Sequence, residues 1–136
     1  MLELPAFLTP LERAVVELIL DGLPKSQDSL RTQLNLSRRE SRVHNGYGFY
    51  TTFAVPGNSL AAPLRNAHLG ASAYVDDRLC GFLLWIEDGR VNFLEGYPLG
   101  GDAWPNNERP LSHNVAPNNK NFRDLRLDKS NVDSFD

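Results

Sequence analysis

The sequence predicts an α+β domain with two N-terminal helices packed on an antiparallel sheet of about four or five strands. Apolar residues recur at helical spacing near the N-terminus, and further along they alternate with period two around an Asp-Gly turn. The chain has 136 residues, of which 41% are hydrophobic and 23% charged, which suits one hydrophobic core. We expect a single domain over residues 1–113 and a polar, mobile tail over residues 114–136.

The two predicted helices have signals at their ends. Residues 9–12, Thr-Pro-Leu-Glu, match a capping box with proline at the first helical position. Residues 21–24, Asp-Gly-Leu-Pro, supply a glycine and a proline that end the apolar pattern, so the first helix is predicted over residues 10–21. A second helix is predicted from residue 26 or 27 to residue 36, because Ser26 can cap it and an apolar pair four residues apart follows.

The strands are predicted from alternating or continuous apolar runs. Residues 47–55 alternate with period two and predict a strand, whereas residues 56–70 contain two prolines and two glycines and predict a connecting loop. Residues 71–75 start a second strand, and the apolar run over residues 79–86 predicts a central one. Beyond the last strand the chain is rich in Asn, Asp and Pro, and Trp104 is expected to pack against the sheet margin.

A β-hairpin is the strongest local prediction, because Asp88-Gly89 supplies the positive φ angles of a type I′ turn. A regular register then pairs Leu84 with Phe93 and Phe82 with Glu95. One face of this hairpin carries Glu95 together with five apolar residues: Phe82, Leu84, Ile86, Val91 and Phe93. The other face carries Leu83, Trp85 and Leu94. The helices can cover only one of the two faces well, so a loop, the tail or a second subunit must cover the face that remains, and a homodimer is one of these alternatives.

Charge and cysteine content narrow the class of protein. The formal net charge of −3 disfavours nucleic-acid binding, since phosphate neutralisation needs an excess of Lys and Arg. Cys80 is the single cysteine, so neither an intrachain disulfide nor a cysteine-based zinc site is expected, which fits a reducing compartment. The N-terminal residues lack a basic signal region and no apolar run reaches the length of a membrane span. We therefore predict a cytoplasmic protein with no membrane association.

The sequence contains no familiar catalytic motif, cofactor fingerprint or metal-ligand spacing, which disfavours an enzyme, and we predict no cofactor and no metal. Glu95 is the most interesting titratable group, because the regular register puts it on an apolar face, where Arg42 or His44 on a neighbouring strand could pair with it. A structural ion pair, or exposure at the open end of the hairpin, is the alternative to a functional role. The candidate binding residues are Arg42, His44, Tyr50 and Glu95.

The N-terminal region resembles the start of the response-regulator type of DNA-binding domain, over residues 8–13 and 34–37. The segment between them is longer than in that pattern, and Pro24 lies at the turn. No third helix that could enter the major groove is predicted before the first strand. DNA binding through the N-terminal helices is therefore the third functional hypothesis.

Several segments together resemble a family of small uncharacterised bacterial α+β proteins: residues 8–20, 41–53, 81–89, 94–97 and 104–105. The resemblance covers about residues 8–105 and brings no established activity, so it implies no catalytic residue. The hairpin is also similar to one in small immunity-type and accessory proteins of bacteria.

The leading functional hypothesis is a non-catalytic protein-interaction role, in which the chain binds and neutralises a partner protein. It follows from the small size, the acidic charge and the lack of recognisable catalytic geometry. The alternative is a small-molecule-binding protein or enzyme with a site around His44, Tyr50 and Glu95. A deep pocket that contains these side chains would favour this alternative.

Overall fold

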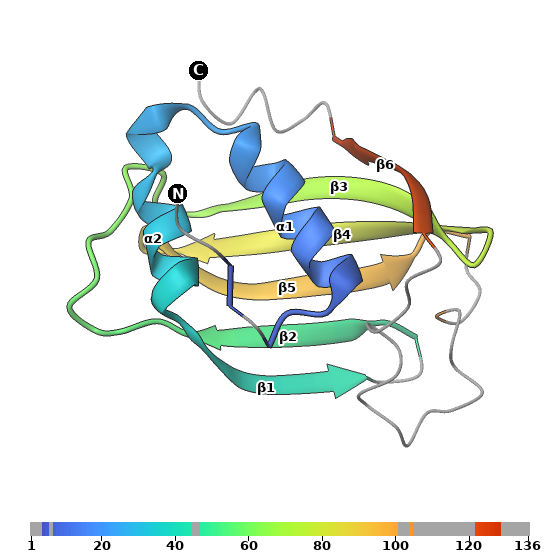
Figure 1. Cartoon of the computed structure of the whole chain (residues 1–136), viewed down its shortest axis with the longest axis horizontal. Helices are drawn as coiled ribbons and strands as arrows, with labels where there is room; N and C mark the ends of the chain where they lie inside the picture. Colours follow the sequence, from blue (N-terminus) through green and yellow to red (C-terminus); the bar gives the residue numbers. More distant parts are fainter. Residues whose placement is uncertain (1–3, 6, 45–46, 101–103, 105–121, 129–136) are drawn as a thin grey trace.

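The computed structural model describes residues 4–5, 7–44, 47–100, 104 and 122–128 of the chain. Helices α1 (Pro10–Asp21) and α2 (Ser29–Leu36) flank the 3-10 turn η1 (Lys25–Gln27) (Figure 1). The described strands are β1 (Arg38–His44), β2 (Phe49–Ala54), β3 (Ala67–Val75), β4 (Arg78–Glu87), β5 (Arg90–Pro98) and β6 (Phe122–Leu127). They form one antiparallel sheet in the order β1-β2-β5-β4-β3-β6. The predicted α+β class is confirmed, with six strands in place of four or five.

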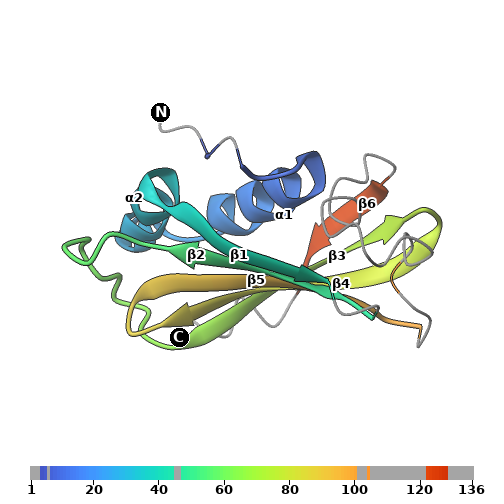
Figure 2. The same ribbon diagram turned by 90° about the horizontal axis from the view of Figure 1, so that it is seen from below.

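Both helices lie on one face of the sheet, and the opposite face carries no helix among the described residues (Figure 2). We call this opposite face the helix-free face. The hydrophobic core lies between the helices and the sheet, where Ile19 and Leu34 are buried with strand residues such as Phe82. Trp104 is fully buried, and its ring meets those of Phe49 and Phe82 edge-on, with centroids 5.0 and 6.0 Å apart. It is therefore a core residue and not a residue of the sheet margin.

The end signals of α1 form as the sequence predicts. The Thr9 hydroxyl accepts a hydrogen bond from the Glu12 backbone N–H at 3.2 Å, and the Glu12 carboxylate accepts one from the Thr9 N–H at 3.0 Å. The predicted bounds of this helix, residues 10–21, are confirmed. Helix α2 begins at Ser29 and not at residue 26 or 27, because the residues before it form the 3-10 turn η1.

Three strand segments lie outside the strand ranges predicted from the sequence, and β1 (Arg38–His44) is the first of them. β3 begins at Ala67, inside the predicted loop, and β6 lies inside the predicted tail. β6 pairs with β3 at the edge of the sheet, so one of its long edges faces solvent, and three of its six residues are charged. Phe122 and Leu127 nevertheless pack against the core. The expectation of an unstructured tail is therefore wrong for residues 122–127.

The turn of the β4–β5 hairpin forms as predicted. Asp88 and Gly89 have positive φ angles of 53° and 76°, and Ile86 faces Val91 in the ladder. The turn packs closely against the preceding loop, because a Cβ at Gly89 would lie 2.6 Å from the Ala62 carbonyl oxygen. Glycine is therefore required here by its φ angle and by the available space.

The register of the same hairpin is not the regular one. A β-bulge accommodates Asn92 as an extra residue, so that Trp85 faces Phe93. As a result, Leu94 is fully buried on the core side, while Phe93 and Glu95 lie on the helix-free face. The predicted register is wrong beyond Val91. The bulge puts Gly96 opposite Phe82 and Leu94 opposite Leu84 on the core side. The regular register would instead bury the carboxylate of Glu95 opposite Phe82, and an unpaired buried charge is costly.

Candidate functional site

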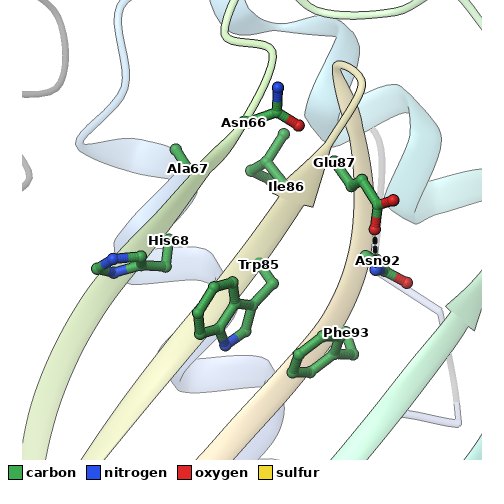
Figure 3. Close-up of a pocket in the computed structure, with 8 residues that line it drawn as sticks. All are labelled: Asn66, Ala67, His68, Trp85, Ile86, Glu87, Asn92 and Phe93. Atoms are coloured by element: carbon green, nitrogen blue, oxygen red, sulfur yellow. Dashed lines mark hydrogen bonds between the residues drawn. The ribbon is translucent and has the colours of Figure 1, made fainter.

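Four ring side chains form a continuous band across the helix-free face, one from each of four neighbouring strands. They are Tyr50 of β2, Phe93 of β5, Trp85 of β4 and His68 of β3, and we call them the aromatic band. Ring centroids are 5.8 Å apart for Tyr50–Phe93, 5.5 Å for Phe93–Trp85 and 4.9 Å for Trp85–His68. Figure 3 shows Phe93, Trp85 and His68 side by side. The register explains this arrangement, because His68 faces Trp85 and Trp85 faces Phe93.

The aromatic band is only partly covered. His68 is exposed, Tyr50 is 36% exposed, and Trp85 and Phe93 are partly exposed. Val43 of β1 is 52% exposed and faces Tyr50, so it extends the apolar surface to the edge of the sheet. Contiguous apolar surface of this kind marks a binding site more often than scattered apolar residues do.

One carboxylate lies within the band. Glu95 faces Tyr50 in the β2–β5 ladder, and its Oε1 accepts a hydrogen bond from Trp85 Nε1 at 3.1 Å. The negative charge of Glu95 is the main cause that raises the pKa of Tyr50, followed by burial and by a hydrogen bond to Glu95. In the part of the chain that the structure describes, no salt bridge includes Glu95.

A second acidic group lies further along the same face. Asp128 follows β6, and its carboxylate lies over Gly70, where a Cβ would be 2.1 Å from Oδ2. Burial raises the pKa of Asp128. Tyr97 covers the facing Gly81, and the pKa of Tyr97 is raised first by burial and then by the charges of Asp128 and Glu95. Both charges that act on Tyr97 are therefore negative.

A pocket of about 380 Å³ opens beside the band, at the turn end of the β4–β5 hairpin. Rings and short polar side chains form most of its lining: Asn66, Ala67, His68, Trp85, Ile86, Glu87, Asn92 and Phe93 (Figure 3). The Glu87 carboxylate accepts a hydrogen bond from the Asn92 side-chain amide at 2.9 Å. Along the strands, the band thus has a carboxylate on each side, Glu95 on one and Glu87 on the other.

The structure brings together two of the four candidate residues. Tyr50 and Glu95 are neighbours on the helix-free face. Arg42 points to the other face, where its side chain is almost fully buried in a salt bridge with Glu12 of α1. His44, two residues further along β1, lies on the same face as Arg42, and burial lowers its pKa. Arg42 and His44 are therefore separated from Glu95 by the sheet itself.

Sequence reasoning missed the other three rings of the band. The regular register puts Phe93 on the face of Phe82 and Trp85 on the opposite face, and His68 falls within the predicted loop. The signal that could have revealed the bulge is the spacing of Val91 and Leu94, which are both buried although they lie three residues apart in one strand. Residues that share a face of a regular strand are separated by an even number of positions.

Comparison of the chain with protein-family models, curated proteins and solved structures gives no match. The resemblance to a bacterial family therefore stays a prediction. Among the described residues, no helix is long and apolar enough to cross a membrane. The same residues include no group of three or more His, Cys, Asp or Glu side chains that could hold a metal ion. Function is therefore inferred from the side chains of the helix-free face.

Proposed function

We propose that this chain is a bacterial, cytoplasmic protein-interaction domain that binds a partner protein through the helix-free face and performs no catalysis, as immunity and accessory proteins do. The observation that carries the proposal is the partly exposed aromatic band across four adjacent strands. A cytoplasmic location is supported by Cys80, which is a free, buried thiol.

Aromatic rings on a rigid sheet suit a protein interface for two physical reasons. Tyr, Trp and Phe are enriched at the buried centres of interfaces, because each contributes a large apolar area. The rings of the band also hold one another in place, since Trp85 stacks on Phe93 with an interplanar angle of 20° and donates a hydrogen bond to Glu95. Little side-chain freedom is then lost on binding, which lowers the entropic cost of association.

Catalysis by Cys80, Glu95 or His44 has less support. Burial raises the pKa of Cys80 to about 12, so its thiol is protonated at neutral pH and is a poor nucleophile. Glu95 accepts a hydrogen bond from the indole of Trp85, which is neither an acid nor a base in this pH range, and one from Tyr50, whose raised pKa keeps the phenol protonated at neutral pH. His44, the third member of the site predicted from sequence, lies on the other face of the sheet.

Site-specific photocrosslinking in the native host tests which surface binds the partner. A photoreactive phenylalanine analogue replaces Val43, which is exposed beside Tyr50, or Glu17, which is exposed on α1. We expect an adduct of discrete mass from position 43 and none from position 17. Adducts from position 17 alone, or equally from both positions, would refute binding through the helix-free face, and no adduct from either would refute the protein-interaction role.

A small-molecule ligand is the second candidate, favoured by the pocket of about 380 Å³ beside Trp85. His68 takes the place that the sequence hypothesis gave to His44, while Tyr50 and Glu95 keep theirs. A metabolite screen that follows the indole N–H signal of Trp85 by NMR tests this candidate, and an unchanged signal across the screen would count against it. DNA binding has less support, because α2 is followed directly by β1 and the apolar stripe of α1 is buried.

A further inference from the structure

We infer that Glu95 and the rings beside it bind the guanidinium group of an arginine presented by the partner protein. This inference rests on the proposed function and specifies its chemistry. The partner carries a basic segment on the surface that meets the helix-free face, and one arginine of that segment contacts Tyr50 and Phe93 while it pairs with Glu95.

The first observation is a carboxylate that has neutral donors but no cation among the residues that the structure describes. The Trp85 indole N–H donates to Glu95 Oε1 at 3.1 Å, and the Tyr50 phenol is near enough for its pKa to be raised by the carboxylate. Within the described ranges, none of the salt bridges includes Glu95. A carboxylate offers about four acceptor positions, so a cationic donor can bind without displacing Trp85.

The second observation is the ring surface around this carboxylate. Tyr50 and Phe93 are inclined by 60° at 5.8 Å, and Phe93 is nearly parallel to Trp85 at 5.5 Å. A guanidinium is planar, stacks on aromatic rings and pairs with a carboxylate through two parallel N–H groups. The ammonium of lysine is more compact and more strongly hydrated, so it gains less from the same surroundings. Because Glu95 is partly buried, the pairing is stronger than in open water.

The charges on this face disfavour other ligands. The two carboxylates that flank the band, Glu95 and Glu87, would repel a phosphate or a carboxylate placed on its rings. The arginines Arg123 and Arg126 of the same face lie in β6, and β3 and β4 separate them from Glu95 of β5. A neutral ligand would leave the charge of Glu95 without a counter-charge. Arg123, a described arginine on the same face, is already engaged by the Tyr74 ring at 4.4 Å and by two Asp carboxylates.

The test uses a minimal probe in place of the unidentified partner. N-acetyl-arginine amide is titrated into the full chain, and the indole N–H signal of Trp85, assigned with a Trp85→Phe variant, is followed by NMR. We expect saturable shifts with a Kd on the order of millimolar, as suits a single side chain. N-acetyl-citrulline amide has the same shape without the charge, and we expect it to bind at least about tenfold more weakly, which corresponds to ~1.4 kcal/mol.

Two matched variants locate the site. Glu95→Gln keeps an oxygen that can accept the Trp85 hydrogen bond but removes the charge, and it should weaken arginine binding by about tenfold. Glu87→Gln makes the same chemical change on the other side of the band and should leave arginine binding unchanged. Equal binding of citrulline, an unaffected Glu95→Gln variant, or a larger effect of Glu87→Gln would each overturn the inference. A well-dispersed amide spectrum confirms that each variant is folded.

The same variants separate this inference from the proposed function. If crosslinking from position 43 persists unchanged in Glu95→Gln, the protein-interaction role stands and the guanidinium site is refuted. If the arginine probe binds as expected but neither position yields an adduct, the guanidinium site stands and the protein-interaction role is refuted. Loss of the adduct in Glu95→Gln, together with arginine-specific binding of the probe, supports both.

Discussion

Removing Arg42 should destabilise the fold, because it would leave the carboxylate of Glu12 buried without a cation. Glu12 is fully buried, and the Arg42 side chain is 5% exposed. The guanidinium of Arg42 pairs with Glu12 and also donates to the Phe7 carbonyl oxygen at 3.2 Å. Breaking a buried ion pair by removing one partner costs about 3–5 kcal/mol. Since Glu12 retains the Thr9 N–H and the Thr51 hydroxyl as donors, we expect the lower end, about 3 kcal/mol.

Urea unfolding followed by circular dichroism measures this loss in Arg42→Met. The matched control is Arg31→Met, which removes an exposed ion pair with Asp21 at 2.6 Å and should cost less than about 1 kcal/mol. Adding Glu12→Gln to Arg42→Met removes the unpaired charge, so the double variant should be more stable than Arg42→Met alone. The reasoning fails if Arg42→Met costs no more than Arg31→Met, or if the double variant is the least stable of the three.

Three further predictions follow from buried or coupled groups. Gln33→Ala should cost about 1–3 kcal/mol of unfolding free energy in urea, because the Gln33 side chain accepts from the Val91 N–H at 2.9 Å and donates to two backbone carbonyls. Burial raises the thiol pKa of Cys80 to about 12, so as pH rises the thiol ionises in the unfolded chain before it does in the folded one. The contribution of Cys80 to the free energy of unfolding is therefore fully present below about pH 9 and should decline by up to ~1.4 kcal/mol per pH unit until pH 12. Cys80→Ala removes this contribution, so its stability should decline less than that of the unchanged chain over the same pH range, where the raised pKa values of Tyr50 and Tyr97 still act. Glu95→Gln should lower the pKa of Tyr50 toward its usual value, as measured by ultraviolet titration, and an unchanged pKa would contradict the coupling between the two side chains.

The parts of the fold that sequence predicts well are those decided by neighbouring residues. The capping box of α1 and the Asp88-Gly89 turn each depend on side chains and φ angles within four residues, so their positions are evident without knowledge of the rest of the fold. Strand β6 is the opposite case. Half of its six residues are charged, and it is a strand because the edge of β3 offers unpaired backbone groups to it.

The candidate site could be predicted only in part, because it depends on the β-bulge. Tyr50 and Glu95 were both identified from sequence, and they are neighbours through the β2–β5 pairing. Trp85 and Phe93 join them because the extra residue Asn92 turns Phe93 away from the core. In a regular hairpin Phe93 and Glu95 would lie on the face opposite Trp85, since shifting a strand by one residue exchanges its two faces. The bulged register is the more stable one because it buries Leu94 and leaves Glu95 on the helix-free face. Its stability depends on contacts with residues of the other strands, which the sequence of the hairpin alone does not reveal.

Deletion of Asn92 distinguishes the bulged register from the regular one. In the bulged register Asn92 is the extra residue, so its removal should leave Ile86 facing Val91 and Trp85 facing Phe93, with every later side chain on its present face. The chain should stay folded and lose about 1 kcal/mol, since the exposed hydrogen bond between Asn92 and Glu87 is removed.

In a regular register the same deletion would move all residues from Phe93 to Pro98 to the opposite face and unfold the protein. Deletion of Glu95 is the matched control, because this residue lies in the regular part of the ladder and its loss should exchange the faces of Gly96 and Tyr97. The Phe49 ring lies so close to Gly96 that a Cβ there would be 2.2 Å away, so a larger residue in this place cannot be accommodated without rearrangement of the core. Circular dichroism and urea unfolding should therefore show a cooperative transition for the Asn92 deletion and none for the Glu95 deletion. If both deletions unfold the chain, Asn92 does not act as the residue that the bulge absorbs, and the aromatic band loses its structural explanation.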